Sequence, residues 1–268
     1  RINKNWTLIM AQNKNIEVCV ITGGASGIGG ACARELSARG LPVVIADINP
    51  RGKEVAKSIG GYFYTLDVTD DENVNTCAAT IERDLGPVKH LINCAGVLQQ
   101  PQPPETLSMD IWDKVVNVDQ RGTYLSSVAF AKYMIERETG SITNIASITA
   151  NRSVPLHSYA PAKAAVVAIT ECLAAEWGPH GVRVNAVSPG HTLTPALESA
   201  IKTGKRDPDL LSRNALGRMV KADEVAKAVA FLISDDAAAI TGVNLPVDCG
   251  WLVSTSWTTY GGLRKSND

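Results

Sequence analysis

The chain has 268 residues, of which 45% are hydrophobic and 20% are charged, and its formal net charge at pH 7 is −1. This length suffices for one large α/β domain with a full core, and the composition is typical of folded rather than disordered proteins. The near-zero charge gives no indication of a nucleic acid or a membrane surface as partner, and no apolar run approaches the ~20 residues of a membrane span.

The chain begins RINKNWTLIM, without an initiator methionine. We therefore expect a native start at Met10 and set residues 1–9 aside as a leader. Six cysteines are scattered without a Cys-x-x-Cys pair, and no histidines are paired at ligand spacing. These cysteines are typical of reduced core residues in a cytoplasmic protein, and we expect no metal site.

Short apolar runs rich in Val and Ile alternate with amphipathic stretches along the chain. The predicted strands occupy residues 18–22, 42–47, 62–67, 90–94, 141–147, 182–188 and 243–248. The main predicted helices occupy residues 27–39, 71–84, 110–138, 159–178 and 222–234. This alternation predicts βαβ units, and hence one parallel sheet with helices on both faces. We therefore predict a single-domain, doubly wound α/β fold over residues 10–250, with a tail over residues 251–268.

The first predicted strand leads directly into TGGASGIG, residues 22–29. Gly23, Gly27 and Gly29 give the spacing G-x3-G-x-G at the start of a helix. Such glycines let the backbone turn tightly and approach a pyrophosphate, whose charge then faces a helix N-terminus. The sequence therefore predicts a dinucleotide-binding loop here.

An acidic residue, Asp47, ends the second predicted strand. A carboxylate there can accept hydrogen bonds from the hydroxyls of an adenosine ribose, and it repels a 2′-phosphate. Neither Ile48 nor Ser26 is basic, which favours NAD over NADP. If Asp47 instead caps the following helix, the choice of cofactor stays open.

Tyr159 and Lys163 lie four residues apart in the alanine-rich segment SYAPAKAA, residues 158–165. This spacing puts both side chains on one helix face, and Pro161 between them fits only the first turn of a helix. Taken alone, the pair is more typical of a tyrosine that anchors a core and a lysine that extends to solvent.

Together, the glycine spacing, NCAG at residues 93–96, an upstream serine and the Y-x3-K pair resemble the classical short-chain dehydrogenase/reductase family. The resemblance covers about residues 16–250, and it implies a Rossmann fold with strand order 3-2-1-4-5-6-7. Cys94 and Cys249 depart from the NNAG and DGG motifs of the family. The catalytic set that the resemblance implies is Asn117, Ser147, Tyr159 and Lys163. The implied cofactor contacts are Gly23, Ser26, Gly27, Ile28, Gly29, Asp47, Ile48, Asp67, Val68, Asn93, Ala95, Gly96, Tyr159, Lys163, Pro189, Gly190, Thr192 and Thr194.

The chemistry of these side chains agrees with such roles. A free phenol has a pKa of about 10, and a neighbouring cation lowers it, so we expect Lys163 to make Tyr159 a better base. Tyr159 then accepts the alcohol proton in oxidation and donates it in reduction. We expect Ser147 to hydrogen-bond the reacting oxygen, and Asn117 to hold a water that links Lys163 to solvent.

Polar residues dominate the segments that the resemblance places around the substrate. The candidates for substrate contact are Gln99, Thr149, Asn151, Arg152, His157 and His191. Such a lining favours a small hydroxylated molecule, a polyol or a sugar, over a long apolar chain, although each side chain also suits a solvent-exposed loop. Residues from about 191 to 216 are predicted to form a mobile lid.

Two other functions stay open. An NADPH-dependent ketoacyl-thioester or other ketone reductase would need a basic cofactor pocket and a basic patch for an acidic carrier, and neither is evident. A non-catalytic, dinucleotide-sensing protein on the same fold typically lacks the Tyr or the Lys, and this chain keeps both.

The resemblance also implies a homotetramer. Helices 110–138 and 159–178 would pair across one two-fold axis, and strand 243–248 across another. The tail contains Trp251, Trp257 and Tyr260, which need cover. We predict that the tail packs across a subunit interface beside the neighbouring substrate pocket, with a tail folded on its own subunit as the alternative.

Overall fold

The computed structural model describes residues 17–264, so the predicted leader and the start at Met10 lie outside the described residues. A seven-stranded sheet, parallel at every pairing, forms the centre of the molecule, in the order β3-β2-β1-β4-β5-β6-β9. The strands are β1 (Val18–Thr22), β2 (Val43–Asp47), β3 (Tyr62–Thr65), β4 (Val88–Asn93), β5 (Gly140–Ile145), β6 (Val182–Pro189) and β9 (Asn244–Val247). The predicted fold and strand order are confirmed.

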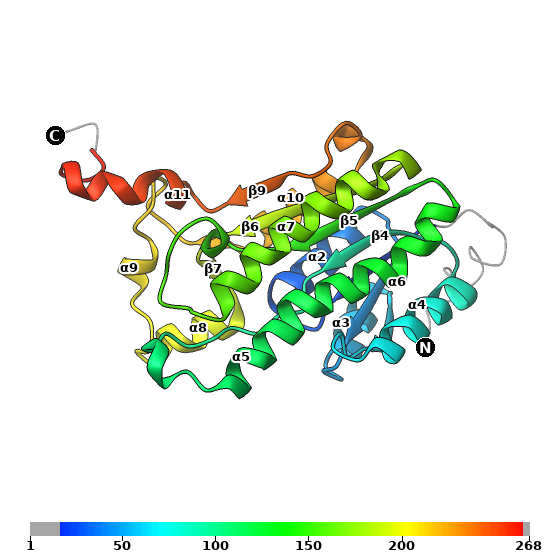
Figure 1. Ribbon diagram of the computed structural model, residues 1–268, viewed down its shortest axis with the longest axis horizontal. Coiled ribbons are helices and arrows are strands. Elements are labelled where there is room, and N and C mark those ends of the chain that lie inside the picture. Colours follow the sequence, from blue (N-terminus) through cyan, green and yellow to red (C-terminus); the bar gives the residue numbers. More distant parts are fainter. Residues whose placement is uncertain (1–16, 265–268) are drawn as a thin grey trace.

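Helices cover both faces of the sheet (Figure 1). Alternate residues of β1 show why: Val18 and Val20 join one buried cluster, whereas Cys19 and Ile21 join the other. The first cluster packs under α4 (Asp71–Leu85), α6 (Gly122–Glu136) and α7 (Tyr159–Trp177). The second packs under α2 (Gly27–Ala38), α3 (Gly52–Ile59) and α10 (Ala222–Ile233). A parallel sheet buried on both faces leaves its carboxyl edge as the place for a site.

The predicted helix over residues 110–138 is interrupted. It consists of α5 (Met109–Val115), a π-helical turn (Val116–Arg121) and α6. A π-helical turn is rare and often occurs at a functional site. Short 3-10 helices cover Pro104–Thr106, Ile148–Ala150, Gly178–His180 and Asp235–Ala237.

The predicted lid contains α8 (Pro195–Lys202) and α9 (Pro208–Leu211), between the short paired strands β7 (Thr192–Leu193) and β8 (Val220–Lys221). These two strands precede β9, which is therefore the seventh strand of the main sheet. The tail forms α11 (Trp251–Ser254) and a 3-10 helix (Thr255–Tyr260), which extend away from the body of the molecule (Figure 1). Between residues 17 and 264, none of the helices has the length and apolarity that a membrane crossing requires.

Candidate functional site

A cavity of about 830 Å³ lies at the carboxyl edge of the sheet, where β1, β2, β4 and β5 end. It gathers residues that are far apart in the sequence, from the glycine loop to the start of α7. The predicted cofactor residues that line it are Gly23, Ser26, Gly27, Ile28, Gly29, Asp47, Ile48, Asp67, Val68, Ala95, Gly96, Tyr159, Lys163 and Thr194.

The glycine loop is shaped by close backbone approach. A Cβ on Gly23 would lie 2.6 Å from backbone atoms of Ala95, and a Cβ on Gly29 would lie 2.3 Å from the carbonyl oxygen of Gly23. Gly23 and Gly27 also have positive φ angles, 68° and 54°. Ser26 precedes α2 without making a side-chain capping bond, so the start of this helix faces the cavity. A phosphate group fits this arrangement, because helix N-termini attract anions.

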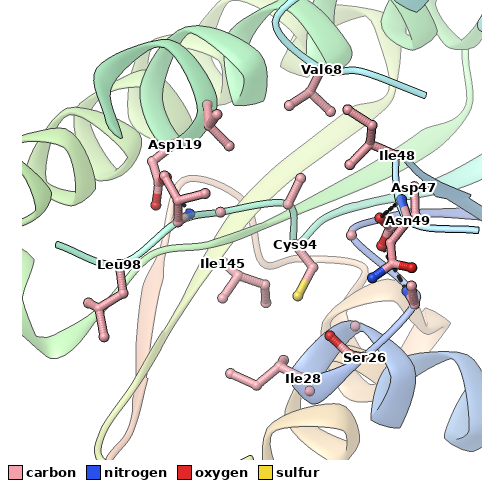
Figure 2. Close-up of a pocket in the computed structure, with 18 of the residues that line it drawn as sticks. Ser26, Ile28, Asp47, Ile48, Asn49, Val68, Cys94, Leu98, Asp119 and Ile145 are labelled. Carbon is pink, nitrogen blue, oxygen red and sulfur yellow. Dashed lines mark hydrogen bonds between the residues drawn. The ribbon is translucent and has the colours of Figure 1, made fainter. Parts of the chain in front are cut away.

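Asp47 is fixed at the end of β2 by two backbone groups (Figure 2). Its Oδ2 accepts a hydrogen bond from the Ala25 N–H at 2.9 Å, and its Oδ1 accepts one from the Asn49 N–H at 2.8 Å. The residue at the N-cap of α3 is Arg51, so Asp47 does not cap that helix. Its carboxylate is free to accept further hydrogen bonds from a molecule in the cavity.

Tyr159 and Lys163 lie in the first turns of α7, and the Lys163 Nζ is 5.6 Å from the centre of the Tyr159 ring. Pro161 is the third residue of that helix, as its fixed φ angle requires. The Lys163 Nζ donates a hydrogen bond to the Ile145 carbonyl oxygen at 2.8 Å. Ser147, just beyond β5, is near enough to Tyr159 to lower its pKa, and its hydroxyl accepts a hydrogen bond from the Thr149 N–H at 3.2 Å.

A carboxylate that the sequence analysis did not select completes this group. Asp119 is fully buried in the π-helical turn, and its Oδ2 lies 3.2 Å from the Lys163 Nζ. Its Oδ1 accepts a hydrogen bond from the Val97 N–H at 2.8 Å (Figure 2). Asn117 lines the cavity, but within residues 17–264 it forms no hydrogen bond or ion pair with Lys163.

The direct contact between this helix and Lys163 is thus made by Asp119, a residue that the sequence analysis left out, whereas the water-mediated role of Asn117 stays a prediction. Helical spacing was the available signal, because Asp119 follows the buried Val115 by four residues and precedes the buried Thr123 by four. Residues at this spacing share the inward face, whereas Asn117 is exposed.

Burial and mutual attraction or repulsion shift the pKa values of all three groups. Burial raises the pKa of Tyr159; Lys163 lowers it, as predicted, but Asp119 raises it again, and the net shift is upward. Burial acts to lower the pKa of Lys163, yet attraction to Asp119 and Tyr159 outweighs it, so this pKa is raised. Burial raises the pKa of Asp119, and Lys163 opposes the rise.

Four of the predicted cofactor residues do not line the cavity: Asn93, Pro189, Gly190 and Thr192. Asn93 is buried, and its Nδ2 donates hydrogen bonds to the side chains of Ser127 and Asn144, both at 2.9 Å. It thereby ties β4 to β5 and α6. A Cβ on Gly190 would lie 2.8 Å from the Cα of Asp248, so this glycine permits two backbone segments to approach. These residues shape the site from outside its surface.

Cys94, which replaces an asparagine of the family motif, points into the cavity (Figure 2). Burial raises the pKa of its thiol to about 12, against a smaller lowering by Lys163. Cys94 is therefore a neutral thiol at physiological pH. Its backbone N–H contacts Thr22 at the end of β1, with 3.2 Å to the carbonyl oxygen.

The predicted substrate residues lie outside the cavity lining, and several are engaged with other parts of the chain. The Oε1 of buried Gln99 accepts hydrogen bonds from the N–H and the hydroxyl of Ser158, at 2.7 and 2.8 Å. The Oδ1 of Asn151 accepts one from Asn244 at 3.3 Å. Arg152 is exposed and His157 is half-buried, while the hydroxyl of Thr149 is buried without a hydrogen-bond partner in the described structure.

His191 connects the lid to the tail. Its Nδ1 lies 3.2 Å from the Leu211 carbonyl oxygen in α9, and its ring meets Trp251 edge-on with 6.0 Å between ring centres. Burial lowers the pKa of His191, so a neutral ring is favoured. The histidine is thus a packing contact between two segments that border the site.

Comparison with known proteins gives consistent matches over most of the chain. A family model described as enoyl-(acyl carrier protein) reductase matches residues 23–252. The D-threitol dehydrogenase of Mycolicibacterium smegmatis is 36% identical over 244 residues, which cover 88% of this chain and 93% of that protein. The NAD-dependent glycerol dehydrogenase of Listeria innocua is 35% identical over 241 residues, covering 88% of this chain and 94% of the relative.

Among solved structures, one titled ribose-5-phosphate isomerase from Brucella melitensis 16M superposes with a TM-score of 0.91. It is 50% identical to this chain, and the match covers 94% of this chain and 98% of that one.

Proposed function

Because the chain belongs to the classical short-chain dehydrogenase/reductase family, a family of oxidoreductases that bind nicotinamide dinucleotides, we propose that it transfers a hydride between NAD(H) and a small polyol or sugar. The observation that carries the proposal is the single cavity that joins the glycine loop and Asp47 at one end to Tyr159 and Lys163 at the other. Bound NAD(H) would supply the hydride donor or acceptor.

The residues that would hold the cofactor follow from the geometry of the cavity. The loop between Gly23 and Gly29 would receive the pyrophosphate against the start of α2. Asp47 would accept hydrogen bonds from the adenosine ribose hydroxyls, and Lys163 would donate to the ribose of the nicotinamide half. Thr194, which lines the cavity from the start of the lid, would close over that half.

The choice of NAD over NADP is supported by the charges near Asp47. The cationic residues that line the cavity are Lys114 and Lys163, and both come from segments other than the glycine loop and the end of β2. Beside Asp47 stand Ile48 and Asn49, neither of which carries a positive charge. A 2′-phosphate placed there would meet a carboxylate without a compensating cation.

Tyr159 is the proposed general acid–base. In oxidation its phenolate oxygen would take the hydroxyl proton of the substrate, and in reduction the phenol would return that proton to the carbonyl oxygen. Ser147, which lies near Tyr159, would hold the same substrate oxygen and fix its position. Lys163 would orient the cofactor and Tyr159 together.

A hydroxylated substrate is supported by the named activities of the threitol and glycerol dehydrogenases. The solved structure that is 50% identical to this chain bears the name of a ribose-5-phosphate isomerase. Phosphorylated sugars are therefore the second candidate substrate class. Cationic groups are present on the substrate side: Arg206 of the lid donates a hydrogen bond to the Gln100 side chain at 3.2 Å, and Arg152 is exposed.

We also propose a cytoplasmic homotetramer. All six cysteines are free thiols, which suits a reducing compartment. The outer face of α7 exposes Ala164, Ala168 and Ala175, whose small side chains permit close approach of another helix. A light-scattering mass at micromolar protein concentration tests this assembly, and a monomer would contradict it.

A substrate panel tests the function. The enzyme is mixed with NAD⁺ or NADP⁺ and with tetritols, pentitols, glycerol, their phosphates and simple secondary alcohols, and NAD(P)H is followed by absorbance. We expect NADH formation with at least one polyol or sugar. Turnover confined to NADPH and ketoacyl thioesters would instead identify a ketoacyl-thioester reductase, and cofactor binding without turnover of any compound would favour a dinucleotide sensor.

A further inference from the structure

We propose that Asp119 is a positioning residue that holds and neutralises Lys163, and thereby sets the pH range in which Tyr159 exchanges its proton. The inference rests on the proposed role of Tyr159 as the general acid–base. Unlike Tyr159 and Ser147, Asp119 would act through another residue rather than on the substrate.

The distances around the Lys163 ammonium carry the proposal. The Lys163 Nζ donates a hydrogen bond to the neutral Ile145 carbonyl oxygen at 2.8 Å, and the anion beside it is the Asp119 Oδ2 at 3.2 Å. The centre of the Tyr159 ring is farther away, at 5.6 Å. Because Asp119 carries a full negative charge at contact distance and a protonated phenol carries none, the carboxylate takes the larger share of the lysine's attraction. The phenol then faces a nearly neutral pair instead of a bare cation.

The carboxylate is locked in this position. It is fully buried, and its other oxygen, Oδ1, accepts the Val97 N–H at 2.8 Å. Gly96 makes room for it, since a Cβ there would lie 3.0 Å from the Asp119 Oδ2 and 3.6 Å from the Lys163 Nζ. The carboxylate therefore cannot turn toward solvent, and its charge has no competing partner in water.

Few other charges act on the phenol. The charged residues that line the cavity are Asp47, Asp67, Lys114, Asp119 and Lys163. Of these, only Lys163 and Asp119 affect the pKa of Tyr159 appreciably, after the dominant effect of burial. Ser147 lowers this pKa by a smaller amount, and Cys94 is a neutral thiol. The charges of Lys163 and Asp119 thus decide how far electrostatic interactions shift the pKa of Tyr159.

The test replaces Asp119 by Asn, which removes the charge and keeps an oxygen that can accept the Val97 N–H. Phenolate formation is followed by ultraviolet difference spectroscopy. Tyr159→Phe is titrated in the same way, both alone and combined with Asp119→Asn, so that the signal of the other tyrosines can be subtracted. We expect Tyr159 to ionise at least about one pH unit lower in Asp119→Asn than in the unmodified protein, because an unpaired cation lowers a neighbouring pKa by one to three units. The acid limb of kcat/KM for alcohol oxidation should move by the same amount.

Asp113→Asn is the matched control. Asp113 lies six residues earlier on the same helical segment, is exposed, and does not contact Lys163. Its replacement should leave both the titration and the pH profile unchanged. An Asp119→Asn variant that loses rate but keeps the pH profile and the tyrosine titration of the unmodified enzyme would assign Asp119 a purely structural role and overturn the proposal.

A measurement on the unmodified protein keeps the proposal testable if the variant does not fold. The titration of Tyr159→Phe is subtracted from that of the unmodified protein. The difference should show that Tyr159 is still protonated at about pH 10, the ordinary pKa of a phenol. A midpoint clearly below that value would mean that Lys163 acts as a free cation, and the proposal would be wrong. These titrations do not depend on turnover, so they test the role of Asp119 alone. The proposed function is tested separately, because activity that survives in Tyr159→Phe would refute the role of Tyr159 as general acid–base.

Discussion

The two ends of the site are built in different ways. At the cofactor end, backbone contacts set the shape: Gly23 against Ala95, Gly29 against Gly23, and Asp47 held by two N–H groups. At the proposed substrate end, polar side chains bind other parts of the chain, as Gln99 does with the N–H and hydroxyl of Ser158 and His191 does with the Leu211 carbonyl. Steric limits on a glycine can be recognised in a sequence, whereas the partner that a loop side chain selects depends on the fold around it.

Tyr159 lies where the two ends meet, and its replacement should separate binding from chemistry most strongly. Tyr159→Phe should lose at least about 10²–10⁴-fold in kcat, because general acid–base catalysis contributes that range. NADH binding, measured by its fluorescence, should remain close to that of the unmodified enzyme. Residual activity above about a tenth would point to another base.

A matched pair of glycines tests whether backbone approach really defines the cofactor end. Gly29→Ala should weaken NADH binding about tenfold to a hundredfold, since its Cβ would meet the Gly23 carbonyl oxygen at 2.3 Å and overpacking costs about 1–3 kcal/mol. Gly30→Ala places a methyl group one residue later, where the nearest atom is 3.6 Å away. Titration of both variants with NADH should show loss of affinity only in the first, and equal losses would refute the explanation.

The preference for NAD⁺ or NADP⁺ tests the proposed role of the Asp47 carboxylate at the cofactor end. Asp47→Ser should lower the ratio of kcat/KM for NAD⁺ to that for NADP⁺ by about tenfold, or ~1.4 kcal/mol, because the repulsion of a 2′-phosphate is lost. Asp67→Ser removes a carboxylate elsewhere in the same cavity and should affect both cofactors alike. Comparable kcat/KM values for the two cofactors in the unmodified enzyme would contradict the proposed role of Asp47.

The tail gives the smallest expected effect and tests the substrate end. Val253, Trp257 and Tyr260 are 71%, 50% and 83% exposed in the single chain, although Trp251 packs on His191. Removal of residues 257–268 should raise the substrate KM about fivefold, roughly 1 kcal/mol, and weaken the tetramer, with little change in NADH affinity. Unaltered KM and mass would mean that the tail belongs to its own subunit alone. The four residues after 264 lie outside the described structure.

Strand positions and the glycine loop were predictable because each depends on local pattern. The run VCVIT, for example, is buried at every position of β1. The helix α3 was not predicted: Val55, Ala56 and Ile59 lie on one face of Gly52–Ile59, but its eight residues make only about two turns. The lid helix α8 is equally short, and α9 and α11 have four residues each.

The catalytic group shows the same limit at the level of single residues. Tyr159, Lys163 and Ser147 lie close together because their motif puts them at the end of a strand and the start of a helix. The interruption of the long helix could not be predicted, since no proline or glycine lies within Val116–Arg121. The sequence analysis therefore did not select Asp119, the side chain that reaches Lys163 from that turn, and it left out the upward effect of Asp119 on the pKa of Tyr159.

The π-helical turn over Val116–Arg121 has a consequence for how this protein tolerates the deletion of single residues. An α-helix advances about 100° and 1.5 Å per residue, so loss of one residue from Val116–Arg121 could be absorbed as regular α-helix. That change would turn α5 relative to α6 and move Asp119 off the face that meets Lys163. Single-residue deletions should therefore abolish activity within these six positions, although the lid and the tail should tolerate them. A scan that measures the activity of single-residue deletion variants along the chain should show a narrow intolerant window at the π-helical turn.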